Sequence, residues 1–304
     1  MTPKKQRIII TGGGGFIGSS LAKELDQKGY SNVLKIDKFP SVNGADKKYA
    51  ICDISDVEKL QNIIQKGDVI IHLASSIIPA TSEANIKKDI EENLLGTISL
   101  LEVCRAKKIK KFIYLSSGGT VYGNTDKKKS KETDVTNPKG FYGVLKLSIE
   151  KYLEVYGHIY GMKYTIIRLG NAFGRKDTGN KNVWAVDNFL QKILNNEACV
   201  INGDGNIVRD YIYIDDVTNF ITRVISDDNI NGIINLGTGK GTSVNEIIST
   251  IEKVSGKKAL VKHSKGKKAD VPYNVLDISK LKALGWKPQY DLKKAIEDLC
   301  TKRK

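Results

Sequence analysis

Residues 11–18 read T-G-G-G-G-F-I-G and follow directly on the apolar run R-I-I-I-T at 7–11. In a dinucleotide-binding fold, glycines spaced like Gly12, Gly15 and Gly18 serve a tight turn, close approach of the backbone to a pyrophosphate, and close helix–strand packing. The free N–H groups at the start of the following helix favour the negative charge of that pyrophosphate. The same letters could form an ordinary glycine-rich turn, but the order of strand, loop and helix favours a phosphate-binding loop.

The end of the next strand-like run supports a bound cofactor. This run, V-L-K-I-D at 33–37, ends on Asp37, nineteen residues after Gly18. A carboxylate at that place accepts hydrogen bonds from a ribose 2′-OH and repels a 2′-phosphate. The sequence therefore predicts NAD, and not NADP, as the cofactor.

Strand-like and helix-like segments alternate along the first 170 residues. The strand-like runs are rich in Ile, Val and Leu almost without interruption, which is typical of strands buried on both faces of a parallel sheet. Strands are predicted at 7–11, 33–37, 69–74, 111–116 and 164–169, and helices at 18–29, 94–106 and 142–156. This alternation predicts an α/β fold with a doubly wound parallel sheet, the Rossmann arrangement.

The pattern loosens after Gly170 into short pieces separated by glycines. Helices are expected there at 184–195, 244–255 and 291–300. We therefore expect two domains. Residues 1–170 would form an NAD-binding Rossmann domain, to which a segment near 208–240 returns, and residues 171–304 would form a smaller α/β substrate-binding domain.

The composition is that of an ordinary globular chain of 304 residues. No apolar run approaches the roughly 20 residues of a membrane span, and the first one is broken at once by glycines, unlike a signal peptide. The four cysteines stand far apart without a C-x-x-C pair, so we expect reduced thiols, a cytoplasmic location and no metal centre. The net charge of +15 is spread along the chain without aromatic interleaving. It fits attraction of an anionic small substrate and not a nucleic-acid partner.

Tyr142 and Lys146, in F-Y-G-V-L-K, stand at i and i+4 of one predicted helix and so share a face. A cation so close would lower the pKa of the phenol toward the working pH, which lets a tyrosine act as general acid and base. The pattern Y-x-x-x-K is common by chance, and a half-buried aromatic beside a surface lysine would look the same. Its position after a nucleotide-binding fold and after S-S-G-G-T-V-Y-G (116–123) favours the catalytic interpretation.

With these features the sequence resembles the extended short-chain dehydrogenase/reductase family, the group of NAD-dependent sugar-nucleotide epimerases and dehydratases that includes the UDP-glucose 4-epimerases. The resemblance covers nearly the whole chain. Besides the glycine loop and F-Y-G-V-L-K, it rests on the motifs C-D-I (52–54), H-L-A (72–74), E-N-L-L-G-T (92–97), V-Y-G (121–123), R-L-G-N-A-F-G (168–174), R-D-Y-I-Y-I-D-D (209–216), N-L-G-T-G (235–239) and L-G-W-K-P (284–288).

The resemblance implies a role for individual residues. Tyr142 would be the acid/base, and Lys146 would tune it and also bond the nicotinamide ribose. Asn171 would contact the sugar or the diphosphate of a nucleotide sugar, and Arg209 would clamp the diphosphate with its planar fork of donors, although either could instead stabilise its loop. The implied cofactor-binding set is Gly12, Gly15, Phe16, Ile17, Gly18, Asp37, Lys38, Asp53, Ile54, Leu73, Ala74, Asn93, Ser116, Tyr142 and Lys146.

Two positions depart from the family's pattern. Gly118 stands where the usual catalytic Ser or Thr precedes V-Y-G, so it could border the substrate but not bond it through a hydroxyl. Thr120 and Ser117 are the candidates to supply that hydroxyl, and Thr120 comes first because alternate residues of an extended strand face the same side. In K-K-A-D-V, Lys267 stands where relatives often carry arginine, and it would meet a phosphate only as a point charge.

Three reactions share this scaffold. A 4,6-dehydratase usually carries an Asp-Glu pair just before V-Y-G, where this chain has Gly119 and Thr120. A net reductase usually has a basic residue in place of Asp37. We therefore expect NAD-dependent epimerisation at C4 of a nucleotide sugar, a UDP-hexose by family precedent, through a transient 4-keto intermediate. A reductase or dehydratase of the same family and a non-catalytic NAD-binding protein stay open as alternatives.

Family analogy also suggests a homodimer built on two helices per subunit, including the helix with Tyr142. Apolar residues recur on that helix at Leu145, Ile149, Leu153 and Tyr156. Either core burial or burial against a partner could explain them.

Overall fold

The computed structural model describes residues 3–41, 46–76, 85–124, 128–175, 185–265 and 271–302. The chain forms two compact units, each assembled from segments far apart in the sequence. The first unit comprises Met1–Val121, Pro138–Arg168 and Thr218–Ile234, and the second comprises Tyr122–Asn137, Leu169–Val217 and Asn235–Lys304. The segment that returns to the first unit is thus shorter than the expected 208–240.

A seven-stranded sheet organises the first unit. Its strands are β1 (Ile8–Thr11), β2 (Val33–Asp37), β3 (Tyr49–Ile51), β4 (Val69–His72), β5 (Lys111–Ser117), β6 (Tyr164–Leu169) and β10 (Gly232–Leu236). They lie in the order β3-β2-β1-β4-β5-β6-β10, and β1 pairs in parallel with both β2 and β4. The first six follow the order of a dinucleotide-binding sheet, so the expected doubly wound α/β fold is confirmed.

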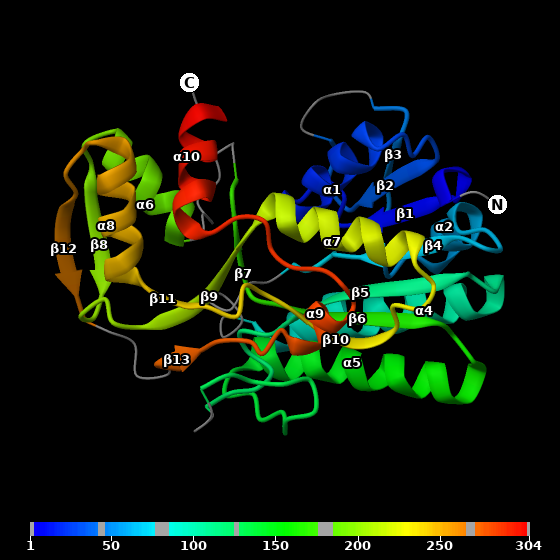
Figure 1. Ribbon diagram of the computed structural model, residues 1–304. Helices are drawn as coiled ribbons and strands as arrows, with labels where there is room; N and C mark the ends of the chain where they lie inside the picture. The colour runs from blue at the N-terminus through cyan, green and yellow to red at the C-terminus, as the bar shows by residue number, and fades with distance from the viewer. Residues whose placement is uncertain are drawn as a thin grey trace. The chain divides into compact units, whose positions relative to one another are not determined.

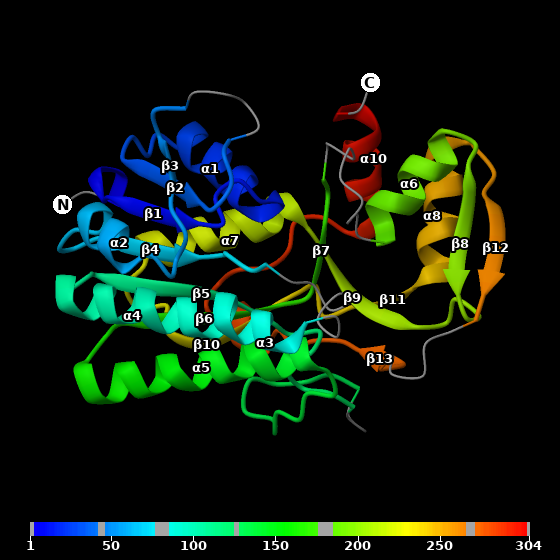
Figure 2. The same ribbon diagram turned by 180° about the vertical axis from the view of Figure 1, so that it is seen from behind.

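Helices cover both faces of this sheet (Figures 1 and 2). α7 (Ile214–Ser226) lies on the face seen in Figure 1, and α4 (Gly96–Lys107) and α5 (Phe141–Tyr160) lie on the face seen in Figure 2. α1 (Phe16–Gln27) is on the side of α7, since residues of both helices line one pocket. The remaining helical segments of this unit are η1 (Pro3–Lys5), α2 (Val57–Ile63), α3 (Ile86–Asp89) and the π-helix η2 (Ile90–Leu95).

The strands form much of the core because most of their side chains are apolar on both faces of the sheet. All four residues of β1 and of β4 are buried, as expected for a sheet covered on both faces. The apolar stripe of α5 at Leu145, Ile149, Leu153 and Tyr156 is buried as well. Core burial therefore explains that stripe.

The described residues of the second unit form two smaller sheets and four helices. β9 (Val208–Tyr213) pairs with β7 (Asn171–Phe173), β11 (Gly241–Ser243) and β13 (Tyr273–Asn274), while β8 (Ala198–Asn202) pairs with β12 (Leu260–Ser264). The helices are α6 (Ala185–Leu194), α8 (Val244–Ser255), α9 (Ser279–Ala283) and α10 (Leu292–Lys302). A capping box between Ser243 and Glu246 starts α8, which explains why its first boundary was predictable.

Several elements differ from expectation. The helix expected at 94–106 is preceded by the π-helix η2, and the helix expected at 142–156 extends over Phe141–Tyr160.

All four cysteines are free thiols; Cys300 is half-buried and the other three are buried. Within the described ranges, no helix is both long and apolar enough to cross a membrane.

Candidate active site

The three motif glycines occupy three different environments. Gly12 has φ +68°, and a Cβ built on it would lie 2.7 Å from the backbone N of Ala74, so this position requires glycine. A Cβ on Gly18 would lie 2.3 Å from the carbonyl oxygen of Gly12, which makes Gly18 the point of closest helix–loop packing. Gly15 is exposed at the N-cap of α1, and its Cβ would approach only that same carbonyl, at 3.2 Å. This arrangement fits a loop that leaves its outer side free for a pyrophosphate at the start of α1. Phe16 and Ile17, in the first turn of α1, are half-buried.

Asp37 lies at the end of β2 beside the same loop. Its carboxylate accepts hydrogen bonds from the backbone N–H of Gly14 at 3.1 Å and of Phe39 at 3.3 Å. The next residue, Lys38, directs its ammonium to Glu92, 2.8 Å away, and not to the loop. An oriented acid with an ion-paired lysine beside it fits a ribose diol better than a 2′-phosphate.

A series of hydrogen bonds through His72 holds the segment that follows β4. Thr97 donates its hydroxyl hydrogen to the Asn93 carbonyl at 2.5 Å, so it accepts from Nε2–H of His72 at 2.9 Å. Nδ1 of His72 therefore accepts from the hydroxyl of Thr11 at 2.7 Å. Burial and the charge of Lys146 lower the pKa of His72 to about 3, which keeps this neutral tautomer over the physiological range.

The hydrogen bonds through His72 position three predicted cofactor residues. Asn93, inside η2, accepts from the backbone N–H of Ser76 at 2.9 Å and donates to its hydroxyl, while Leu73 and Ala74 continue β4 as half-buried residues. A π-helix within a longer helix is frequent at functional sites. The motif H-L-A was visible in the sequence, but the connection from His72 to Asn93 depends on tertiary contacts.

Asp53 and Ile54 follow β3 and have different surroundings. The carboxylate of Asp53 accepts from the N–H and the hydroxyl of Ser55, at 2.9 and 2.7 Å. Ile54 is buried, with its Cγ1 placed 3.0 Å from where a Cβ on Gly96 would stand. The first residue thus keeps a half-exposed polar group near the end of the sheet, and the second belongs to the core.

Lys146 is the most deeply buried of the predicted catalytic residues, with 5% of its surface exposed. Its Nζ donates to the carbonyl of Leu115 at 3.0 Å and lies 5.0 Å from the ring centre of Tyr114 and 5.7 Å from that of Tyr142. Burial lowers the pKa of Lys146 to about 8, against the opposing effect of the Glu150 carboxylate. Burial also raises the pKa of Tyr142, so the expected lowering of the phenol pKa is wrong: desolvation of the phenolate outweighs the neighbouring cation.

The chain between Ser117 and Val121 is a turn and not an extended strand. β5 ends at Ser117, whose carbonyl accepts from the N–H groups of Thr120 at 3.3 Å and Val121 at 3.2 Å. Strand alternation, on which the choice of Thr120 was based, therefore does not apply. The turn nevertheless brings Thr120 to the start of α5, because a Cβ on Gly143 would lie 2.8 Å from the Thr120 carbonyl.

The hydroxyls around this turn differ in what they bond. Oγ1 of Thr120 is buried and has no hydrogen-bond partner among the described residues. The hydroxyl of Ser116, in contrast, donates to the carboxylate of Glu150. Ser117 is half-buried and Gly118 is buried. An unpaired buried hydroxyl costs about 1–3 kcal/mol, so Thr120 is the group in this turn that a ligand oxygen would satisfy.

Of the predicted substrate residues, Gly118 lies in the first unit, and Asn171 and Arg209 lie in the second. Asn171 opens β7 and Arg209 lies on the adjoining strand β9, where the register pairs Asn171 with Tyr211. Arg209 is half-buried, and its Nη1 donates to the carbonyl of Val208 at 2.9 Å. Lys267 lies outside the described residues. Within the described ranges, no cluster of His, Cys, Asp and Glu could hold a metal ion.

Sequence reasoning overlooked two buried charged groups of the first unit, Glu150 and Arg168. Nε and Nη2 of Arg168 donate to the Glu150 carboxylate, the shorter contact being 2.7 Å. The signal was available, since Glu150 follows Lys146 by four residues and Tyr142 by eight, and so continues the same helix face.

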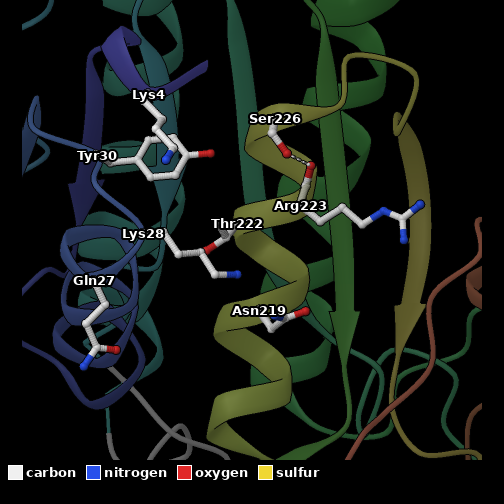
Figure 3. A pocket seen from close by; sticks show the side chains of 8 residues that line it. All are labelled: Lys4, Gln27, Lys28, Tyr30, Asn219, Thr222, Arg223 and Ser226. Carbon is white, nitrogen blue, oxygen red and sulfur yellow. Dashed lines mark hydrogen bonds between the residues drawn. The ribbon is translucent and has the colours of Figure 1, made fainter. Parts of the chain in front are cut away.

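A separate pocket of about 520 Å³ lies between α1 and α7 (Figure 3). It lies near the amino ends of β1 and β2, whereas the glycine loop follows the carboxyl end of β1. Its cations Lys28 and Arg223 are at the carboxyl ends of the two helices, where positive charge offsets the helix dipole, and Lys28 is paired with Glu24 at 2.9 Å. Figure 3 also shows Arg223 directed away from Lys4 and Lys28. These residues are explained without a ligand.

Residues 8–237 match the model of the NAD dependent epimerase/dehydratase family. The chain belongs to this family. The resemblance seen in its motifs is thereby confirmed, and its place among NAD-dependent epimerases and dehydratases identifies NAD as the cofactor that the glycine loop and Asp37 suit.

Relatives in this epimerase/dehydratase family match over at least 95% of the chain. It is 35% identical to a putative UDP-glucose 4-epimerase of Methanocaldococcus jannaschii, over 95% of this chain and 96% of the relative. It is 30% identical to a dTDP-4-dehydro-6-deoxyglucose reductase of Escherichia coli, over 98% of both chains. The crystal structure of Thermus thermophilus UDP-glucose 4-epimerase in complex with NAD superimposes with a TM-score of 0.89 at 29% identity, covering 98% of this chain and 99% of that one.

Proposed function

We propose that this chain is an NAD-dependent epimerase that inverts C4 of a nucleotide sugar, with UDP-hexoses as the substrate class. The observation that carries the proposal is the buried Lys146 ammonium beside Tyr142, in the same unit as the glycine loop and Asp37. The similarity to UDP-glucose 4-epimerases over the full length supports the choice of substrate and reaction.

The described residues fit NAD. Gly15 leaves the outer side of the loop open for a pyrophosphate, and Asp37 is oriented by the loop N–H to accept from the adenosine ribose. Asn93, Leu73 and Ala74 would form the wall along the cofactor. Bound there, NAD supplies reversible oxidation of the sugar carbinol at C4.

Tyr142 would take the proton from the sugar 4-OH and return it after the 4-keto sugar has rotated to present its opposite face. Burial disfavours the negatively charged phenolate of Tyr142. The neighbouring ammonium of Lys146 would stabilise that negative charge during the step. The unpaired hydroxyl of Thr120 would bond the same sugar oxygen in place of the residue missing at Gly118. Arg209 and Lys267 would bind the diphosphate, which suits their donors, and Asn171 would contact the sugar or the diphosphate.

A net reductase is the second candidate. Its support is the similarity to a dTDP-4-dehydro-6-deoxyglucose reductase, together with Gly118, which departs from the usual catalytic hydroxyl. The two functions differ in their need for external reductant. An epimerase returns its cofactor to NAD in each turnover, whereas a reductase consumes one reduced cofactor per sugar.

We further propose a homodimer that uses α5. Its outer face exposes Val144, Tyr152, Val155 and Ile159, with Ile159 60% exposed, at helical spacing. Several exposed apolar side chains on one helix face are typical of a protein–protein contact. The free cysteines fit a reducing compartment, so we place the enzyme in the cytoplasm.

The experiment is a panel of UDP- and dTDP-sugars incubated with the purified protein and catalytic NAD, with C4 epimers resolved by NMR. We expect epimers of one UDP-hexose without net change in cofactor, and Tyr142→Phe should nearly abolish turnover while NAD still binds. Stoichiometric loss of NADH with a 4-keto sugar and no epimer formation would replace the epimerase by the reductase.

A further inference from the structure

A buried ion pair continues the catalytic face of α5. Tyr142, Lys146 and Glu150 stand at i, i+4 and i+8, so they lie in one row along the helix. Glu150 is fully buried and Arg168, from β6, is 2% exposed. Arg168 binds the carboxylate through two nitrogens, with Nε–Oε2 at 3.1 Å and Nη2–Oε2 at 2.7 Å. This geometry is that of a fixed, desolvated pair and not of a surface salt bridge.

Glu150 and Lys146 form hydrogen bonds with two consecutive residues of β5. The ammonium of Lys146 donates a hydrogen bond to the carbonyl of Leu115. The carboxylate of Glu150 accepts a hydrogen bond from the hydroxyl of Ser116. Leu115 and Ser116 lead directly into the turn that carries Gly118 and Thr120. The row on α5 therefore fixes the end of β5, and with it the turn, relative to Tyr142.

The charge of Glu150 also reaches Lys146. Among the described residues, the titratable groups near the Lys146 ammonium are Tyr142 and Glu150 on α5, Tyr114 on β5 and His72 on β4, and Arg168 on β6 is paired with the Glu150 carboxylate. Burial drives the pKa of Lys146 down, and the carboxylate of Glu150 is the group that opposes this. The phenols and the neutral imidazole bring no negative charge that would do the same at neutral pH.

We propose that Glu150, held by Arg168 and Ser116, is a positioning residue that keeps Lys146 protonated and aligned for Tyr142. The activity part of this proposal rests on the proposed epimerase function, but the charge on Lys146 does not. The competing explanation is a purely structural ion pair, which apolar or neutral side chains of similar size can replace without loss.

The two explanations separate when the pair is neutralised as a whole. Glu150→Gln alone removes the carboxylate charge that faces the buried guanidinium of Arg168 and should lower the melting temperature. The double variant Glu150→Gln/Arg168→Met removes both charges and should recover most of that stability. Only the tuning role predicts that the pKa of Lys146 in the double variant stays below its wild-type value, because the Glu150 carboxylate is still missing.

The direct measurement is NMR of protein labelled with 13C at lysine Cε, with the Lys146 signal assigned by its loss in Lys146→Met. We expect a midpoint near 8 in the wild type. Because one nearby opposite charge is lost, the midpoint should fall by about one unit in Glu150→Gln. In the double variant it should also fall, by a smaller amount. The alkaline limb of kcat/KM should move to lower pH in parallel.

Glu154→Gln is the matched control, since it makes the same change one turn further along α5, in the exposed pair with Lys151. It should leave both the melting temperature and the Lys146 midpoint unchanged. A double variant with the wild-type Lys146 midpoint would overturn the proposal and leave a structural pair. A wild type without epimerase activity would refute the proposed function alone, because the NMR titration does not depend on turnover.

Discussion

The glycine loop offers a direct test, because alanine would clash with the backbone at one of its positions and fit with little strain at another. Gly18→Ala places a Cβ 2.3 Å from the carbonyl oxygen of Gly12 and 2.8 Å from Cα of Gly13. Both neighbours are backbone atoms that cannot rotate away. Gly15→Ala places a Cβ 3.2 Å from that carbonyl and otherwise in open space. We expect Gly18→Ala to reduce both stability and NAD affinity, and Gly15→Ala to reduce NAD affinity alone.

The magnitude follows from the overlap. Relief of the contact at Gly18 to an ordinary separation of about 3.4 Å requires a displacement of about 1 Å, since 3.4 − 2.3 is 1.1. Overpacking of this kind costs about 1–3 kcal/mol, and alanine in a helix regains up to about 1 kcal/mol. Because the overlap is with backbone atoms, the cost lies toward the upper end of that range, which leaves a net loss of about 1–2 kcal/mol and a fall of about 2–6 °C in melting temperature. At Gly15, the N-cap preference for glycine and the lower unfolded-state entropy of alanine nearly offset each other.

The assay is thermal unfolding of the wild type and both variants, with NAD affinity measured by calorimetry on the same preparations. NAD affinity should fall by about tenfold or more in each variant, which is a loss of about 1.4 kcal/mol. Gly18→Ala melting within about 1 °C of the wild type would refute the packing argument. Gly15→Ala binding NAD as tightly as the wild type would refute the placement of the pyrophosphate.

Four further predictions concern the catalytic turn, the cofactor, the pH dependence and the assembly. Thr120→Val should lower kcat by about 100-fold without a loss of melting temperature, because its hydroxyl has no partner among the described residues; an unchanged kcat would shift the role to Ser117. Asp37→Ala should narrow the ratio of NAD to NADP affinity by about tenfold, measured by calorimetry, and equal wild-type affinities would contradict the assignment. The Lys146 ammonium is present below its pKa of about 8 and lost above it, so kcat/KM measured against pH should decline as pH rises through that value. Val155→Glu with Ile159→Glu should turn a dimer into a monomer in light scattering, and a wild type that is already monomeric at micromolar concentration would exclude this interface.

Much of the fold was predictable because the central strands are rich in Ile, Val and Leu. β1, β2, β4, β5 and β6 lie within one or two residues of the predicted positions. β3 was missed because its three residues, Tyr49–Ile51, lie at the sheet edge and show no burial pattern. The π-helix η2 was missed because hydrophobic periodicity does not reveal a change in the backbone hydrogen-bond register.

The candidate site was predictable where motif spacing coincides with helix geometry. Tyr142 and Lys146 share a face because they are four residues apart, and the structure keeps them together. The choice of Thr120 rested on an extended chain, whereas hydrogen bonds to the Ser117 carbonyl close a turn there. Its unpaired hydroxyl could be recognised only once the packing around the turn was known.

α5 combines three surfaces whose roles can be separated. Its inner row holds the end of β5 through Leu115 and Ser116, so a small shift of the helix would carry the turn with Thr120 along with Tyr142. Its apolar stripe is buried in the core, and its outer stripe faces away from both. Changes on the outer stripe should therefore act on assembly and stability while leaving the geometry between Tyr142 and Lys146 intact. Changes in the inner row should act on the charge of Lys146 even when the protein stays folded and assembled.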